Sequence, residues 1–133
     1  MNSKYWWLIN VQRTIRAYPE LRERKDDAQR QSIIASYSSD PHGGNGAKRN
    51  TELAALRGLA PAEEAALDAI EQSLAEADLR LPEIRRMVKL HYWDGWTMEQ
   101  IARSMHVSRE TVIRWNGWIV RKIAARMGLY VKR

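Results

Sequence analysis

The side chains with the most distinctive chemistry lie close together near the C-terminal end of the chain. They are two arginines, one glutamate and one threonine: Arg109, Glu110, Thr111 and Arg114. An arginine fork pairs with guanine, a glutamate accepts a hydrogen bond from the amino group of cytosine, and a threonine meets a base acceptor or the thymine methyl group. We therefore expect these side chains to contact DNA bases, if one helix presents them outward together.

Two helices joined by a short turn would position this set. Thr97 and Gln100 have the Thr-x-x-Gln spacing of a capping box, which predicts the start of the first helix. Ser108 repeats the capping signal and predicts the start of the second. The positions predicted to face inward are apolar and recur at helical spacing: Ile101, Met105, Val112, Trp115 and Ile119. This pattern indicates a helix-turn-helix, in which the N-terminal residues of the second helix meet base edges in the major groove.

Positive charge is concentrated around this motif. The chain carries 22 Lys and Arg against 16 Asp and Glu, a net charge of +6, and from residue 97 onward the only acids are Glu99 and Glu110. Residues expected to contact DNA phosphates are Arg103, Ser108, Arg121, Lys122 and Arg126. Between residues 61 and 78 the balance is reversed, and the acids there are predicted to form a solvated face. This asymmetry predicts double-stranded DNA as the partner of the C-terminal end.

Other chemistries find little support in the sequence. The chain has no cysteine, which excludes thiolate sites and fits a cytoplasmic protein. His42, His91 and His106 lack metal-site spacing, and the carboxylates show no arrangement suited to acid–base catalysis. The glycine-rich run 43–49 lacks the Gly-Lys-Ser/Thr ending of a P-loop, and the apolar run 5–11 is too short to span a membrane. We predict no catalytic residue, no cofactor and no metal, and the protein is not expected to be an enzyme.

Hydrophobic periodicity and turn-forming residues predict an all-α fold in four parts. An N-terminal helical arm covers residues 1–35 and bends at Pro19. A flexible loop covers 36–50. A long helical segment at 51–80 contains one helix over 51–59 and another that begins at Pro61. The helix-turn-helix domain covers 81–133. In the arm, the residues recurring at helical spacing are Leu8, Ile9, Gln12 and Ile15.

Two surfaces leave alternatives open. In the segment 51–80 and just beyond it, apolar residues alternate steps of three and four: Leu67, Ile70, Leu74, Ala77 and Leu81. This pattern suits either a homodimeric coiled coil or packing within the chain's own domain. The Trp6-Trp7 pair either folds back onto the core or binds a partner. We favour folding back, because exposed aromatic patches are uncommon on soluble proteins.

The helix that supports the motif is predicted to begin near Pro82 and to end after Trp93, at Gly95. The C-terminal third is rich in tryptophan: Trp93, Trp96, Trp115 and Trp118. Core filling is favoured over stacking on unpaired bases, with Trp118 as the expected exception. Gly117 costs a helix about 1 kcal/mol relative to alanine. We therefore expect a bend at Gly117 or a close approach of the Trp93 or Trp96 ring.

The C-terminal part resembles region 4 of bacterial sigma factors. The similarity runs from about residue 81 to 127 and is carried by Leu81-Pro82-Glu83-Ile84, Leu90-His91-Tyr92-Trp93-Asp94-Gly95-Trp96-Thr97-Met98-Glu99-Gln100-Ile101-Ala102 and Val107-Ser108-Arg109-Glu110-Thr111-Val112. The resemblance implies a trihelical unit that reads a promoter element. Sigma factors usually carry a basic residue where this chain has Ile113 and a charged pair where it has Asn116-Gly117, so their promoter specificity is not carried over.

The remainder resembles small phage and prophage transcription regulators of the RinA/ArpU type. The matching stretches are Tyr37-Ser38-Ser39-Asp40-Pro41 and Arg114-Trp115-Asn116-Gly117. This resemblance implies control of phage genes, including late or packaging genes. We thus predict a sequence-specific DNA-binding transcription regulator with RNA polymerase as a further partner. The alternatives are an interaction module that docks on RNA polymerase and a small terminase-type packaging subunit.

Overall fold

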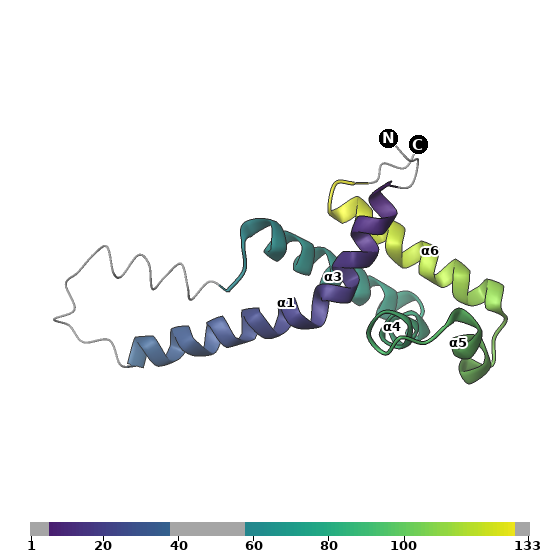
Figure 1. Cartoon of the computed structure of the whole chain (residues 1–133), viewed down its shortest axis with the longest axis horizontal. Coiled ribbons are helices and arrows are strands. Elements are labelled where there is room, and N and C mark those ends of the chain that lie inside the picture. Colours follow the sequence, from purple (N-terminus) through teal and green to yellow (C-terminus); the bar gives the residue numbers. More distant parts are fainter. Residues whose placement is uncertain (1–5, 38–57, 130–133) are drawn as a thin grey trace.

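The computed structural model describes residues 6–37 and 58–129, with side chains from 6–31 and 58–129. These residues form an all-α fold, as predicted. The elements are α1 (Trp6–Tyr37), α3 (Pro61–Arg80), α4 (Glu83–Val88), the π-helix η1 (Lys89–Trp93), α5 (Met98–Met105) and α6 (Arg109–Arg126) (Figure 1). The predicted loop over 38–50, the predicted helix over 51–57 and His42 lie outside the described residues.

The core is organised around α6, which packs against α1, α3, α4 and α5. Its inward residues Ile119 and Ile123 are fully buried, together with Ile70 and Leu74 of α3 and Ile101 of α5. The same cluster includes residues of α1, α4 and η1. Helices from both sides of the undescribed segment therefore share one core.

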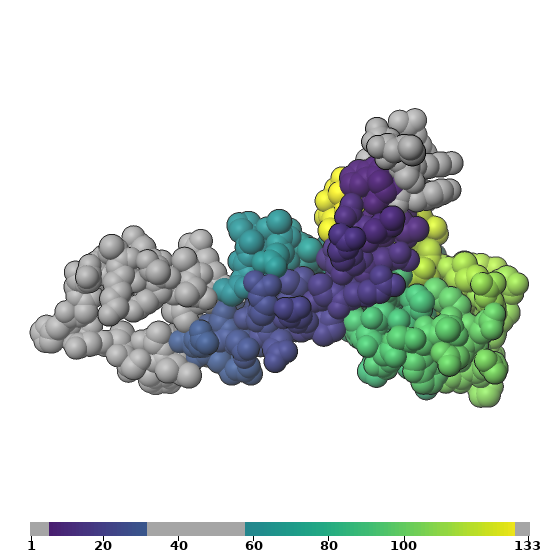
Figure 2. Space-filling model, viewed as in Figure 1, coloured from purple at the N-terminus to yellow at the C-terminus, as the bar shows by residue number. Residues whose placement is uncertain are grey.

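The first half of α1 belongs to this core. Figure 2 shows it lying against the C-terminal end of α6 and against the α4–η1 region, and α1 contacts both α6 and η1. Ile15 of the predicted stripe is fully buried, but Val11, which was not part of the stripe, is fully buried as well, and Ile9 is 60% exposed. The pattern alone was misleading because this part of α1 packs against several elements at once.

Pro19 lies inside α1 and does not end it. The helix changes direction midway, and its second half extends away from the helix-turn-helix (Figure 1). A proline within a helix removes one backbone hydrogen bond and crowds the preceding turn, which accounts for the predicted bend. The helix also continues through Tyr37, two residues into the segment predicted as a loop.

The two tryptophans at the start of α1 behave differently. Trp7 packs against the core, as favoured for the pair. Trp6 is 49% exposed, so folding back holds for only one of the two rings.

Helix α3 begins at Pro61 as predicted, but residues 58–60 are not helical, so the predicted helix over 51–59 is wrong at its end. Gly58 has φ +72°, a conformation that favours glycine. A Cβ atom at this position would lie 2.7 Å from both the Ala28 Cβ atom and the Arg24 carbonyl oxygen. The Arg24 guanidinium also donates a 2.9 Å hydrogen bond to the Gly58 carbonyl oxygen. The chain therefore enters α3 pressed closely against α1.

The apolar face of α3 is covered by the chain itself. Leu67, Ile70, Leu74 and Ala77 are fully buried, and α3 packs against α1, α4 and α6. Of the two alternatives for this pattern, packing within the chain is the one observed. These residues are not available for a coiled coil between copies.

The acidic face of α3 is exposed to solvent as expected, but it also forms ion pairs that were not predicted. Its carboxylates form ion pairs with three other helices: Glu63 with Arg24, Glu64 with Lys25, Glu71 with Arg22, Asp78 with Arg85, and Glu76 with both Lys122 and Arg126. Each exposed pair contributes little stability, about 0.2–1 kcal/mol. Together they pair the acids of α3 with basic residues of α1, α4 and α6.

Helix α4 begins at Glu83, directly after Pro82, and Gly95 ends the region with φ +77°, both as predicted. The π-helical turn of η1 was not predicted. Its wide turn is closed by a 2.9 Å hydrogen bond from the Asp94 amide to the Lys89 carbonyl oxygen. No described helix is both long enough and apolar enough to cross a membrane.

Candidate nucleic-acid interface

Helix α5 begins at the capping box expected from the sequence. The Thr97 hydroxyl accepts a 3.2 Å hydrogen bond from the Gln100 amide, and the Gln100 side-chain oxygen accepts one of 2.9 Å from the Thr97 amide. At the other end, His106 adopts the left-handed conformation with φ 58°. The Val107 amide then donates to the Ala102 carbonyl oxygen at 3.0 Å, which closes the turn between the two helices.

Helix α6 begins at Ser108, again as predicted. The Ser108 hydroxyl oxygen accepts a 3.1 Å hydrogen bond from the Thr111 amide and lies 2.8 Å from the Thr111 hydroxyl oxygen. Val112 and Ile119 are fully buried, and Trp115 is half-buried against the core. The burial of these apolar residues therefore determines which side of α6 faces the core and which side faces outward.

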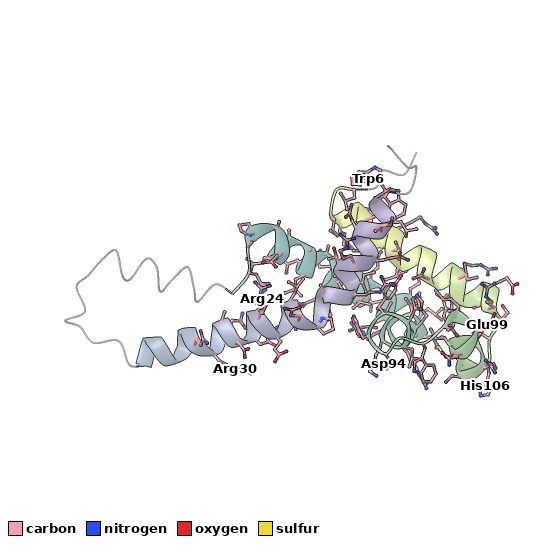
Figure 3. The ribbon with its side chains drawn as sticks, in the orientation of Figure 1. Trp6, Arg24, Arg30, Asp94, Glu99 and His106 are labelled. Carbon is pink, nitrogen blue, oxygen red and sulfur yellow. The ribbon has the colours of Figure 1, made fainter. Side chains whose placement is uncertain are left out.

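Three of the four side chains expected to contact bases are exposed at the start of α6: Arg109, Glu110 and Arg114. The Nε atom of Arg109 lies 4.0 Å from a carboxylate oxygen of Glu99 on α5. Thr111 is the exception, because it is half-buried and its hydroxyl takes part in the helix cap. Glu99 lies with the turn residue His106 at the helix-turn-helix end of the molecule (Figure 3).

The residues expected to contact phosphates divide into two groups. Arg103 is exposed on α5 and lines a shallow hollow with Trp96 and Gln100. Arg121 is exposed on the outward side of α6, whereas Ser108 serves as its N-cap.

Lys122 and Arg126 are engaged within the protein. Lys122 lies 3.4 Å from Glu76, and the Arg126 guanidinium donates to Glu76 at 3.0 Å and to the Ser73 hydroxyl at 3.2 Å. The structure therefore places Arg103 on α5 beside Trp96 and Gln100, and Lys122 and Arg126 beside Glu76 of α3.

Gly117 has a different neighbour from the one we expected. A Cβ atom at this position would lie 3.0 Å from a guanidinium nitrogen of Arg121, and no atom of Trp93 or Trp96 is among its three nearest neighbours. Helix α6 runs unbroken from Arg109 to Arg126. Glycine thus leaves room for the Arg121 side chain to fold back along its own helix.

The tryptophans mostly fill the core. Trp93 stacks on Tyr18 with ring centroids 5.3 Å apart, and its indole N–H donates a 2.8 Å hydrogen bond to the Ile15 carbonyl oxygen. Trp118 was the expected exception, but it packs against the core, and the cations of Arg80 and Lys122 lie 5.6 and 5.5 Å from its ring centroid. Trp96 is instead the exposed member, at 36%.

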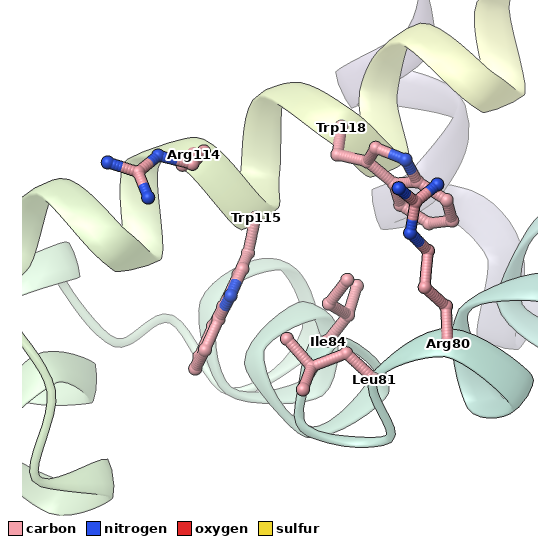
Figure 4. Close-up of a pocket in the computed structure, with 6 residues that line it drawn as sticks. All are labelled: Arg80, Leu81, Ile84, Arg114, Trp115 and Trp118. Atoms are coloured by element: carbon pink, nitrogen blue, oxygen red, sulfur yellow. The ribbon is translucent and has the colours of Figure 1, made fainter.

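A groove separates α6 from the junction of α3 and α4. Figure 4 shows Trp115 reaching from α6 toward the side of α4, Leu81 and Ile84 on the opposite wall, and Arg80 extended over Trp118. Arg114 contributes to the rim of this groove and projects away from it in the same view. The Arg114 guanidinium can therefore reach a partner that approaches the outward side of α6.

A hydrogen-bond network that the sequence did not reveal joins α1 to α6. The Tyr92 hydroxyl donates to the Asn116 side-chain oxygen and accepts from the Gln12 side-chain amide at 3.5 Å. The Arg16 guanidinium lies 5.6 Å from the centroid of the Tyr92 ring. Burial raises the pKa of Tyr92, while the hydrogen bond from Gln12 and the charge of Arg16 oppose this shift. The available signals were Gln12, a polar residue within the predicted stripe of the arm, and Asn116, a polar residue on the side of α6 that also carries Ile119.

The two described histidines, His91 and His106, show no metal site. The His91 Nδ1 atom lies 2.9 Å from the Trp96 carbonyl oxygen, and His106 forms the C-cap of α5. Across residues 6–37 and 58–129, no group of three His, Cys, Asp or Glu side chains could hold a metal ion.

A family model for region 4 of sigma-70 matches residues 80–115. The match runs from the last residue of α3 through α4, η1 and α5 to Trp115 of α6, and so includes Arg109, Glu110 and Arg114. The chain thus contains a sigma region 4-like helix-turn-helix, the type of domain found in DNA-binding regulators. No curated protein and no solved structure matches the chain. The helix α1, which completes the core, lies outside the match.

Proposed function

We propose that the protein is a sequence-specific DNA-binding regulator of transcription that places α6 in the major groove. The observation that carries this proposal is the exposed set of Arg109, Glu110 and Arg114 at the capped start of α6, within the sigma region 4-like segment. Helices of this motif present their N-terminal residues to base edges. The two arginines would pair with guanine, and Glu110 would accept from a cytosine amino group.

Phosphate contacts would fix the position of the domain on the duplex. Arg103 and Arg121 are exposed on α5 and α6 and are the cations we assign to this role. Lys122 and Arg126 are left out of it, because both pair with Glu76. The Ser108 side chain caps α6, so its backbone amide rather than its hydroxyl is the group we assign to a phosphate.

The biological setting follows from the resemblance to the RinA/ArpU type, which supports control of phage or prophage genes, including late genes. Sigma region 4 domains bind RNA polymerase as well as DNA, so the polymerase is the second partner that we propose. Dimerisation through α3 is not part of the proposal, because the apolar face of α3 is covered by its own chain.

The test begins with selection of genomic DNA fragments by the purified protein, followed by titrations at several salt concentrations. We expect one preferred sequence, with an affinity that falls steeply as salt rises through counterion release. Arg114→Ala should weaken binding to that sequence by about 1–3 kcal/mol and relax the preference at one position.

Arg30→Ala is the matched control, since Arg30 pairs with Asp27 in the part of α1 far from the helix-turn-helix (Figure 3). This variant should bind like the unmodified protein. An equal loss on all sequences for Arg114→Ala would contradict the base contact, and binding that does not respond to salt would favour a module that docks on protein.

A further inference from the structure

Ile113 is an exposed apolar side chain on the helix that we propose to enter the groove. It is 43% exposed, whereas Val112, Ile119, Val120 and Ile123 of the same helix are at most 1% exposed. Residues four apart lie on the same side of a helix, so Ile113 is adjacent to Arg109, and Arg114 follows it directly. The outward surface of α6 therefore presents an apolar group between two arginines.

Thr111, the other candidate for an apolar contact with DNA, is less accessible than Ile113. Thr111 was expected to meet a thymine methyl group, but its side chain is half-buried and lies 2.8 Å from the Ser108 hydroxyl. Its amide also donates to Ser108. Because the Thr111 hydroxyl and amide are engaged at the N-cap, Ile113 is the most accessible apolar side chain on the outward side of α6.

We propose that Ile113 determines specificity by contacting the C5-methyl group of a thymine, next to the base pairs read by Arg109 and Arg114. This inference rests on the proposed function. The thymine methyl is the apolar feature that distinguishes this base in the major groove, and an aliphatic side chain recognises it by excluding water.

A protein-docking role fits the surroundings of Ile113 less well. Arg109, Glu110 and Arg114 beside it are all exposed and charged. The result is one apolar side chain among charges, which is smaller than the contiguous apolar patches that mark protein interfaces. A base-pair edge in the major groove presents polar groups beside an apolar methyl group, so this mixture of charged and apolar side chains matches it better.

The experiment uses the full chain and the preferred DNA sequence found by selection. Each thymine is replaced in turn by uracil, which removes the methyl group and keeps every hydrogen-bonding group. For the unmodified protein we expect one position to lose about fourfold in affinity, the amount expected for one buried methyl group. For Ile113→Ala we expect weaker binding to the thymine site and no further loss on uracil replacement at that position.

Two more variants complete the design. Ile113→Val should retain part of the sensitivity to uracil. Ile9→Ala removes an isoleucine that is 60% exposed on α1 and should keep the full sensitivity.

Specific binding in which uracil replacement has no effect, or in which Ile113→Ala remains fully sensitive, would overturn the inference and leave the proposed function standing. Failure of the unmodified protein to select any DNA would overturn both.

Discussion

Tyr92 links the N-terminal helix to the recognition helix through one hydroxyl group. It donates to Asn116 and accepts from Gln12, and these contacts join residues far apart in the sequence. Tyr92→Phe should lower the free energy of unfolding by about 1 kcal/mol, since a typical hydrogen bond contributes that much and partly buried partners are left behind. Urea denaturation measures the loss.

Tyr18→Phe serves as the matched control, because phenylalanine keeps the ring that stacks on Trp93. This change should cost less than Tyr92→Phe. Equal losses would show that the hydrogen bonds of the Tyr92 hydroxyl contribute no more to stability than the Tyr18 hydroxyl does.

The two tyrosines also predict how stability depends on alkaline pH. Burial is the main cause that raises the pKa of both Tyr18 and Tyr92 above 10.0. A pKa raised in the folded state gives stability that is fully present below the unfolded value and is lost as pH rises through the folded value. Unfolding experiments at increasing pH should therefore show a fall in stability above about pH 10, and Tyr92→Phe should make this fall shallower. If Tyr92→Phe left the loss of stability at alkaline pH unchanged, the raised pKa of Tyr92 would not be one of its causes.

At the scale of elements, two glycines with the same backbone conformation offer a direct comparison. Gly58 and Gly95 have φ +72° and +77°. A Cβ atom at Gly95 meets nothing within 4 Å, whereas one at Gly58 would collide with Ala28 and with the backbone of Arg24. Gly95→Ala should cost about 1–2 kcal/mol for the left-handed conformation alone.

Gly58→Ala should cost clearly more than Gly95→Ala, because either α1 or the start of α3 must also move. Thermal unfolding of the two variants side by side measures the difference. Equal costs would mean that α3 does not need its close contact with α1.

The elements that could be predicted from the sequence are those fixed by adjacent residues. Thr97 with Gln100, Ser108, Pro61 and Gly95 all act within one turn of the chain, and each marks a boundary found in the structure. The role of Thr111 in the cap was also within reach, since it follows Ser108 at capping-box spacing.

Features that depend on distant partners were missed. Which side of α1 is buried depends on α6 and η1, and the role of the acids on α3 depends on basic residues of three other helices. The elements that cover α1 and the basic residues that pair with the acids of α3 cannot be identified before the fold is known. The ion pairs of Lys122 and Arg126 with Glu76 were missed for the same reason, and because of them these two cations are left out of the proposed phosphate contacts.

At the scale of the whole molecule, the cations differ in whether the described residues pair them. Arg103 is exposed on α5 and forms no ion pair within residues 6–31 and 58–129, whereas Arg126, also exposed, is paired with Glu76 and Ser73. Arg103→Ala should reduce the slope of log affinity against log salt by about 0.9, the value for one phosphate contact. Arg126→Ala should leave the slope unchanged and lower stability instead.

Titrations of both variants across a range of salt concentrations, with urea denaturation in parallel, separate these roles. An equal change in slope would show that Arg126 leaves Glu76 to bind DNA, as the sequence alone suggested.

The π-helical turn of η1 determines how much variation in chain length this protein can tolerate. Its wide turn lets two consecutive side chains reach α1: Tyr92 contacts Gln12, and Trp93 donates to Ile15. Deleting one residue between Lys89 and Trp93 would leave the Asp94 amide four residues from the Lys89 carbonyl oxygen, so the same hydrogen bond would close an ordinary α-helical turn. The residues from Asp94 onward would keep their places, and the loss would fall on the contacts that Tyr92 and Trp93 make with α1. We therefore expect such a deletion to lower stability while α5 and α6 keep their orientation.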